Sequence, residues 1–366
     1  MGQSLSAMTV DHVRRPDRRD LARRFSHGER EFTSSPLYQR LSGIVAADDR
    51  LLAIAEHCRA GQQPTNLLFA AVHYLLLSGA GTPPPLAAWY PSLGGTRDPR
   101  DPALTSVFTD FCGTHEAALT ALVASRLVQT NVVQRSAALR IGLAAIDEPG
   151  PVTLLEVGAS GGIHLAFDAY RCRIGDIEIG PTGSPVRIRT EWRSPLPVPT
   201  RIPEIGDRLG IDLHPIDLTD PTERRWLRAL VWPENLPQYE LLRAAADLVA
   251  ARSPRILVGD AATLLPQLDE TLPTDRPLVV WHAATRVHVP QERRAAFDAA
   301  IGALGRRRRL YTVSLEAPDD TAQWYARYGI SYALSVRAGA EPARRLAAAD
   351  GHLTWIEPLP EPGAGT

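Results

Sequence analysis

The sequence predicts an α/β protein in which a mostly parallel sheet of about seven strands follows an all-helical N-terminal region. Residues 11–147 show helical patterns punctuated by proline and glycine, without two-residue alternation. After residue 149, short apolar segments alternate with helical ones, which is typical of an open parallel sheet. The first of these segments, 152–157, runs into a glycine-rich turn at 158–162. Glycines at the end of a buried strand let the backbone approach a ligand.

The composition excludes several classes of protein. The chain has 366 residues, 44% hydrophobic and 22% charged, with a net charge of -1. This balance gives no electrostatic reason to expect nucleic acid as a partner. The 40 basic residues are all arginine, so lysine Schiff-base chemistry and a lysine-dependent phosphate loop are excluded.

Cysteine content and hydropathy bear on the compartment. Three cysteines far apart in the chain, Cys58, Cys112 and Cys172, show neither zinc-site spacing nor the density of a disulfide scaffold, so we expect a cytoplasmic protein and no metal. No uncharged run reaches the ~20 residues that span a bilayer, so we expect no membrane partner. The oligomeric state cannot be deduced from the sequence.

Within the helical region, Ser35 and Pro36 are expected to start a helix that runs toward Cys58. The segment 64–77 is so apolar that we expect it to be buried, with His73 as a core histidine. A loop at 81–101, rich in proline and glycine, separates it from a helical segment at 102–127.

The second half alternates strands and helices. The last two strands are expected to form an antiparallel hairpin, and a long segment near 170–206 to form an inserted hairpin or lid. We therefore predict domains at 1–148 and 149–357 and a flexible tail at 358–366. The predicted strands are 152–157, 207–213, 255–259, 277–282, 309–315, 330–336 and 353–356. The predicted helices are 220–230, 238–251 and 290–304.

The glycine turn is compatible with more than one chemistry. A dinucleotide site needs G-x-G-x-x-G with an acid about 20 residues later, whereas here the acid Glu156 precedes Gly158. A G-x-S-x-G elbow matches literally and would make Ser160 the nucleophile of a serine hydrolase. The helical character of the preceding chain and the absence of an oxyanion-hole loop disfavour the hydrolase hypothesis.

A third hypothesis comes from a resemblance. The run LLEVGASGG at 154–162 resembles the first motif of class I S-adenosylmethionine-dependent methyltransferases, with serine in place of the second glycine. The resemblance implies a Rossmann-like methyltransferase sheet that binds S-adenosylmethionine. Acids that end the next two predicted strands match the order of that family. The implied cofactor-binding residues are Glu156, Gly158, Ala159, Ser160, Gly162, Asp212, Asp260 and Ala261.

A wider resemblance covers nearly the whole chain. The sequence resembles an uncharacterised two-domain bacterial family with a helical Q-T-N region, a G-A-S-x-G turn and a signature after Gly210. It departs from that pattern at Val132, where glutamate is expected, and at His164, where asparagine is expected. From this resemblance Gln129, Asn131 and Arg135 are added to the cofactor-binding set. The other matching positions are Thr130, Asp212, Asp217, Trp226 and Trp232.

Methyl transfer needs in-line positioning and, for a protonated acceptor, a base. His282 ends a predicted strand at the edge where α/β sites form, and we predict it to be the general base. Glu316, after the next strand, and His164, after the glycine turn, are further catalytic candidates. The predicted function is methyl transfer to a small molecule. The alternatives are a serine hydrolase that uses Ser160 and a non-catalytic ligand-binding protein of the same fold.

Overall fold

The computed structural model describes residues 17–79, 81–329 and 331–360. The chain forms two compact units, and their sequence segments are interleaved. The helical unit comprises residues 1–130 and 220–243, and the sheet unit comprises residues 131–219 and 244–366. This division differs from a single boundary near residue 149, because residues 131–148 pack with the sheet and residues 220–243 with the helices.

The helical unit is built around an apolar core to which both of its segments contribute. Trp226, from the second segment, is 2% exposed and lies in the same core cluster as the N-terminal helices, while Trp232 packs against it. The helices are α1 (Arg18–Glu31), α2 (Pro36–Ala46), α3 (Asp49–Ala55), α4 (Pro64–Ser78), α5 (Ala103–Thr114), α6 (Glu116–Ser125) and α8 (Pro221–Ala229), with 3₁₀ helices η2 (Pro85–Trp89) and η3 (Pro91–Leu93). Helix α9 (Leu236–Ala250) begins in this unit and ends in the other.

Local chemistry explains the ends and burial of these helices. Helix α2 begins at Pro36, and the Ser35 hydroxyl caps it by accepting a hydrogen bond from the Tyr38 N–H at 3.1 Å. Helix α4 is apolar on all sides and buried, and His73 is a core histidine as predicted. Its Nδ1 lies 3.1 Å from the Ala229 carbonyl oxygen, and burial lowers the pKa of the ring to about 4.

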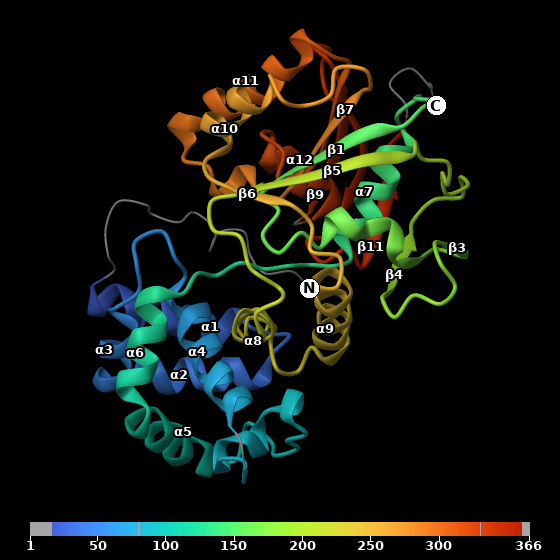
Figure 1. The fold of residues 1–366 in the computed structure, drawn as a ribbon. Coiled ribbons are helices and arrows are strands. Elements are labelled where there is room, and N and C mark those ends of the chain that lie inside the picture. Colours follow the sequence, from blue (N-terminus) through green and yellow to red (C-terminus); the bar gives the residue numbers. More distant parts are fainter. Residues whose placement is uncertain (1–16, 80, 330, 361–366) are drawn as a thin grey trace. The chain divides into compact units, whose positions relative to one another are not determined.

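The sheet unit contains an eleven-stranded mixed sheet in the order β3-β2-β4-β11-β10-β9-β8-β7-β1-β5-β6 (Figure 1). Strands β1, β5, β6, β7 and β8 run parallel to one another, and β9 pairs antiparallel with β8. The strands are β1 (Val152–Val157), β2 (Arg171–Ile174), β3 (Ile177–Ile179), β4 (Arg187–Trp192), β5 (Ile205–Asp212), β6 (Ile256–Val258), β7 (Leu278–Ala283), β8 (Leu310–Glu316), β9 (Tyr332–Ala338), β10 (Arg344–Ala349) and β11 (Trp355–Pro358).

The structure corrects the predicted sheet in three places. The sheet has eleven strands instead of about seven, because the insert forms β2, β3 and β4 at the far edge of the sheet and β10 was not predicted. An antiparallel hairpin is present, but the predicted pairing of 330–336 with 353–356 is wrong, because β10 lies between β9 and β11 and pairs with both. Part of the predicted tail is also ordered: Pro358 ends β11, and the Leu359 N–H bonds the Leu346 carbonyl at 2.9 Å. Residues 361–366 lie outside the described part of the chain.

Helices cover both faces of the central strands. Side chains of α10 (Ala261–Leu268) and α11 (Arg294–Ala303) pack on a face formed by Leu155, Val157 and Val280. Helix α7 (Arg135–Ala144) packs on the opposite face, where a Cβ on Gly142 would lie 2.2 Å from Val313. The carboxyl ends of β1, β5, β7 and β8 therefore form one edge between two helical layers.

Candidate functional site at the carboxyl edge of the sheet

The glycine turn after β1 is anchored to β5. The N–H groups of Gly158 and Ala159 both bond the Ile211 carbonyl oxygen, at 2.8 and 3.1 Å. Gly158, Ser160 and Gly162 have positive φ angles of 78°, 50° and 73°, a region that non-glycine residues seldom adopt. The N–H groups of Gly158 and Ala159 are thus engaged within the protein, and side chains of Thr285, Leu218 and Pro254 pack against the glycines of the turn.

Asp212 ends β5 beside this turn. Its Oδ2 accepts the Ser160 N–H at 2.8 Å, and its Oδ1 accepts the His214 N–H at 2.8 Å. Each carboxylate oxygen has a second lone pair, so Asp212 retains acceptor capacity for hydroxyl groups of a ligand. The structure thus brings Glu156, Ser160 and Asp212 together at one edge, as the sequence predicts.

Asp260 and Ala261 follow β6, and they form the start of α10. Asp260 is the N-cap of α10, where its Oδ1 accepts the Ala262 N–H at 2.8 Å. Its Oδ2 pairs with Arg293 at 2.8 Å. Both carboxylate oxygens therefore have structural partners, and capping is the role that the contacts of Asp260 define.

Glu156 and His164 form a buried pair next to the turn. His164 Nδ1 lies 2.7 Å from Glu156 Oε1, and its Nε2 lies 3.1 Å from the Val132 carbonyl oxygen. Because a carbonyl only accepts, Nε2 carries a proton, and a second proton is shared between Nδ1 and Oε1. The pair is therefore neutral overall. Burial raises the pKa of Glu156, although His164 acts to lower it. The Oε2 atom of Glu156 is buried and has no hydrogen-bond partner.

The two departures from the resembled family pattern meet at this pair. Val132 supplies the carbonyl that His164 contacts, so both changed positions belong to one local arrangement. The neighbouring Asn131 donates a hydrogen bond from Nδ2 to the Ser160 hydroxyl at 3.0 Å. The segment that begins at residue 131 thus lies against the glycine turn.

His282 and Glu316 form a second pair, from the ends of β7 and β8. Glu316 Oε1 lies 2.7 Å from His282 Nδ1 and also accepts the N–H groups of Thr285 and Arg286, at 2.9 and 3.1 Å. Burial alone would raise the pKa of Glu316, but these donors hold it below its ordinary value. The carboxylate is therefore ionised, and His282 Nδ1 donates to it. In the neutral ring, Nε2 then keeps its lone pair.

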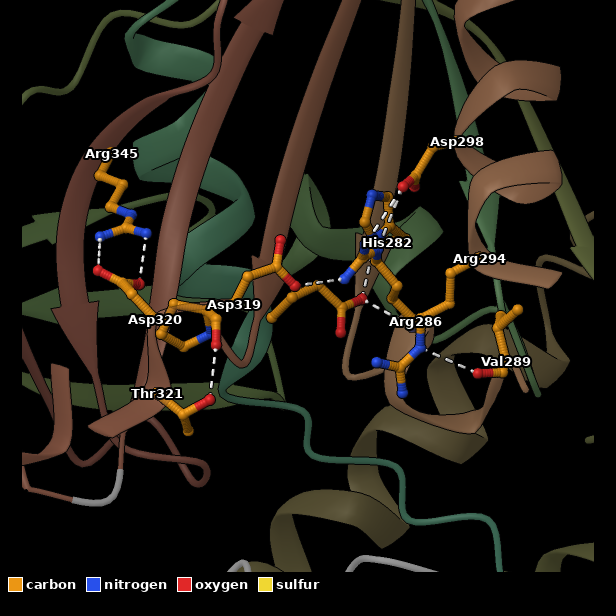
Figure 2. A network of polar contacts seen from close by, with 11 residues as sticks. His282, Arg286, Val289, Arg294, Asp298, Asp319, Asp320, Thr321 and Arg345 are labelled. Atoms are coloured by element: carbon orange, nitrogen blue, oxygen red, sulfur yellow. Dashed lines mark hydrogen bonds and ion pairs between the residues drawn. The ribbon is translucent and has the colours of Figure 1, made fainter. Parts of the chain in front are cut away.

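Arg286 fixes the loop that follows β7. Its side chain contacts Asp298 of α11 at 3.3 Å and Asp319 at 3.0 Å, as Figure 2 shows beside His282. Because the Arg286 N–H also bonds Glu316, one residue ties the loop, the helix and the end of β8 together. The His282 ring is held in place by this network and by an edge contact with Phe297.

The two pairs lie on opposite faces of the sheet edge. Side chains alternate along a strand, and Leu155 and Val280 face α10 and α11. Glu156 therefore points to the α7 face, whereas His282 points to the α11 face, in accord with its contact to Phe297. Thr285 bridges them, since its hydroxyl donates to the Val157 carbonyl at 3.2 Å and its N–H bonds Glu316.

Sequence reasoning missed part of this arrangement. Gln129 falls in the helical unit, and its predicted role in cofactor binding stays a prediction. Thr285, Arg286 and Tyr332 were not anticipated, because they lie in loops or next to a strand start without a distinctive motif. Trp226 and Trp232 are packing residues of the helical unit. The Asp217 side chain accepts hydrogen bonds from Thr219 in a local turn.

The surroundings of Ser160 differ from those of a hydrolase nucleophile. Its hydroxyl accepts from Asn131, and among the described residues no histidine contacts it. The nearest histidine in sequence, His164, has both ring nitrogens engaged by Glu156 and Val132. Within the described ranges, no cluster of three or more potential metal ligands is found. The three cysteines are free and buried.

The fold and this edge define a two-unit α/β protein with polar side chains gathered where parallel strands end, the usual location of ligand sites in such sheets. The chain belongs to a bacterial family described as "Uncharacterized protein conserved in bacteria (DUF2332)", which matches residues 19–357. No curated protein matches the sequence. Among the described helices, none has the length and apolar character required to cross a membrane.

Proposed function

We propose that this protein is an S-adenosylmethionine-dependent methyltransferase that acts on a small molecule. The observation that carries the proposal is the edge formed by β5, β1, β7 and β8, in which a tight glycine turn and Asp212 lie on one side and an oriented histidine on the other. The central order β6-β5-β1-β7-β8 also follows the arrangement that the resemblance implies, with β1 in the middle.

The residues of the turn fit a nucleoside that carries an amino-acid chain. Gly158 lets the turn pack closely against Thr285, because a Cβ there would lie 2.4 Å from the Thr285 hydroxyl oxygen. Asp212 has lone pairs left for ribose hydroxyls. Glu156 Oε2 and Trp281 Nε1 are buried and unpartnered, an acceptor and a donor for which a bound ligand would supply partners.

His282 is the proposed general base. S-adenosylmethionine supplies an electrophilic methyl group, so the protein's task is to position the acceptor and remove its proton. Glu316 holds the His282 ring with Nδ1 protonated, which leaves the Nε2 lone pair to take that proton. The same carboxylate stabilises the imidazolium that results, because it accepts the Nδ1 hydrogen bond throughout.

Calorimetry tests the cofactor assignment. We expect saturable binding of S-adenosylmethionine and of its demethylated product, and Asp212→Asn should weaken both about 10-fold or more, a loss typical of hydrogen bonds to a charged group. His282→Ala should leave these affinities unchanged. No binding of either compound to the native protein would refute the proposal. Binding without transfer in a broad acceptor screen would indicate a non-catalytic ligand-binding protein.

A serine hydrolase is the second candidate, because Ser160 adopts a positive φ of 50° within a G-x-S-x-G sequence. Its hydroxyl contacts an amide instead of a histidine, which disfavours activation by a base. A fluorophosphonate probe distinguishes the candidates. We expect no labelling, and labelling that Ser160→Ala abolishes would establish the hydrolase instead.

A further inference from the structure

Arg135, the first residue of α7, is a buried cation that Glu316 attracts at a distance but that makes no direct ion pair among the described residues. Arg135 is only 7% exposed, and its Nε is buried without a hydrogen-bond partner. Among the described residues, the guanidinium makes one hydrogen bond, a long one of 3.4 Å from Nη2 to the Gly351 carbonyl oxygen. Within the described residues no ion pair joins Arg135 to a carboxylate. Buried arginines are normally paired with an anion. The Nε of Arg140 is also buried without a partner, but the Arg140 guanidinium contacts an aromatic ring and a thiol, whereas that of Arg135 has hydrogen-bonding capacity left for a ligand.

The helix that carries Arg135 adds to the positive potential. Helix α7 begins at Arg135 without a side-chain cap and has no acidic residue in its first turn. The helix dipole therefore adds positive potential at Arg135. The first backbone N–H groups of the helix already bond the carbonyl oxygens of residues 132–134. The guanidinium is therefore the group that a carboxylate at this position would contact.

The neighbours of Arg135 place it on one side of the sheet edge. Its guanidinium lies 5.9 Å from the ring centroid of Tyr332, at the start of β9. Tyr332 directly precedes Ala333, which pairs with Glu316 across β8 and β9. In strand order, β8 and β9 lie on one side of β1, whereas Asp212 and Asp260 follow β5 and β6 on the other. Arg135 thus lies toward β8 and β9 in strand order, on the face that α7 covers, whereas the His282 ring lies on the α11 face.

We propose that Arg135 binds the carboxylate of the methyl acceptor, which makes the substrate a small carboxylic acid. The assignment rests on the proposed function. Arg135 would hold the carboxylate, and the rest of the acceptor would extend past the end of β8 toward His282 Nε2. This goes beyond the sequence expectation for Arg135, which was contact with the cofactor.

Thermal unfolding with matched probes tests the carboxylate site without any cofactor. We expect benzoate and acetate to stabilise the native protein saturably, while benzamide and acetamide do not. Arg135→Met should lower the affinity for the acids about 10-fold or more, the usual loss for a hydrogen bond to a charged group. The ligand-free variant should unfold at the same or a higher temperature, because an unpaired buried charge is removed.

Arg140 provides the matched control on the same helix. It is 4% exposed, but its guanidinium stacks 5.4 Å from the Phe167 ring centroid and bonds the Cys172 thiol. Arg140→Met should keep the preference for acids over amides. Arg135→Lys, which retains the charge without the fork geometry, should weaken acid binding severalfold, and it gives a result even if Arg135→Met fails to fold. Equal responses to acids and amides in the native protein would overturn the proposal.

A second measurement shows whether the carboxylate that Arg135 binds belongs to the methyl acceptor or to the cofactor. Calorimetry compares the demethylated cofactor product with methylthioadenosine, which lacks the amino-acid part, in the native protein and in Arg135→Met. We expect both affinities to be unchanged by the substitution. A selective 10-fold loss for the demethylated product would assign the carboxylate to the cofactor and overturn the acceptor assignment. If the native protein binds neither nucleoside, the proposed methyltransferase function fails, while the comparison of acids and amides still decides the role of Arg135.

Discussion

The sheet edge carries two glutamate–histidine pairs, one on each face, and they differ in how the histidine is held. In both pairs one carboxylate oxygen is buried without a partner. In the first, His164 has both ring nitrogens engaged. In the second, Glu316 accepts three hydrogen bonds at its other oxygen, and among the described residues His282 is hydrogen-bonded through Nδ1 alone. The first pair therefore holds its protons in place, whereas the second leaves a histidine nitrogen available. Only the second is suited to proton transfer.

Turnover should show the largest difference between the pairs. His282→Ala should lower the rate of methyl transfer about 100-fold to 10,000-fold, the range for loss of a general base. His164→Asn, which retains a donor for Glu156, should change the rate less than 10-fold. Transfer of labelled methyl groups from S-adenosylmethionine into a small-molecule extract measures both. Equal losses in the two variants would contradict the division of roles.

The free energy of unfolding should depend more on the first pair than on the second. His164→Ala leaves Glu156 buried without its partner, and removal of one member of a buried pair costs about 3–5 kcal/mol. His282→Ala should cost less, because Glu316 keeps its bonds from Thr285 and Arg286. Urea unfolding of both variants against the native protein provides the comparison. A larger loss for His282→Ala would show that the second pair is the structural one.

Gly158→Ala should disturb the link between the pairs. The new Cβ would lie 2.4 Å from the Thr285 hydroxyl oxygen, at a φ of 78°. We expect a cost of about 1–3 kcal/mol from the backbone strain. The double variant with Thr285→Ala should recover only the part that comes from the clash, which urea unfolding can measure. Full recovery would exclude backbone strain as the cause.

The smallest expected effect is in the acid dependence of stability. The pKa of Glu316 is lowered from 4.5, so its contribution is present above pH 4.5 and is lost as the pH falls through the folded-state pKa. The pKa of Glu156 is raised from 4.5, so its contribution is present below pH 4.5 and is lost as the pH rises through the folded-state pKa. Urea midpoints between about pH 3 and 7 should fall less steeply on acidification in Glu316→Gln and more steeply in Glu156→Gln. Parallel curves would contradict these opposite signs.

The central fold could be predicted because its signals are local. Long apolar strands such as 152–157 and 277–282 are recognisable by composition alone. Strand β10, with the sequence RRLAAA, has helix-favouring residues, and only pairing with β9 and β11 makes it a strand. Strands β2 and β3 are short, so the segment that contains them was predicted only as a hairpin or lid.

Individual residues of the site could be predicted from the sequence, but the contacts between them could not. His282 and Glu316 were identified from their positions at strand ends, yet their contact depends on the pairing of β7 with β8, which no local pattern encodes. The contact between Glu156 and His164 spans eight residues and follows from the sharp turn between them. The burial of Arg135 against Tyr332 joins segments far apart in the chain and required the structure.

The interleaving of the two units has a consequence for synthesis on the ribosome. Proteins are made from the N-terminus, and a unit formed by one continuous segment can fold as soon as it emerges. Here the helical core includes Trp226, and the indole N–H of that residue bonds the Leu127 carbonyl at 2.9 Å. The helical unit therefore stays incomplete until residues 220–243 have left the exit tunnel, by which time β1 and β5 are already available to pair. Neither unit can complete its folding before the other begins to fold.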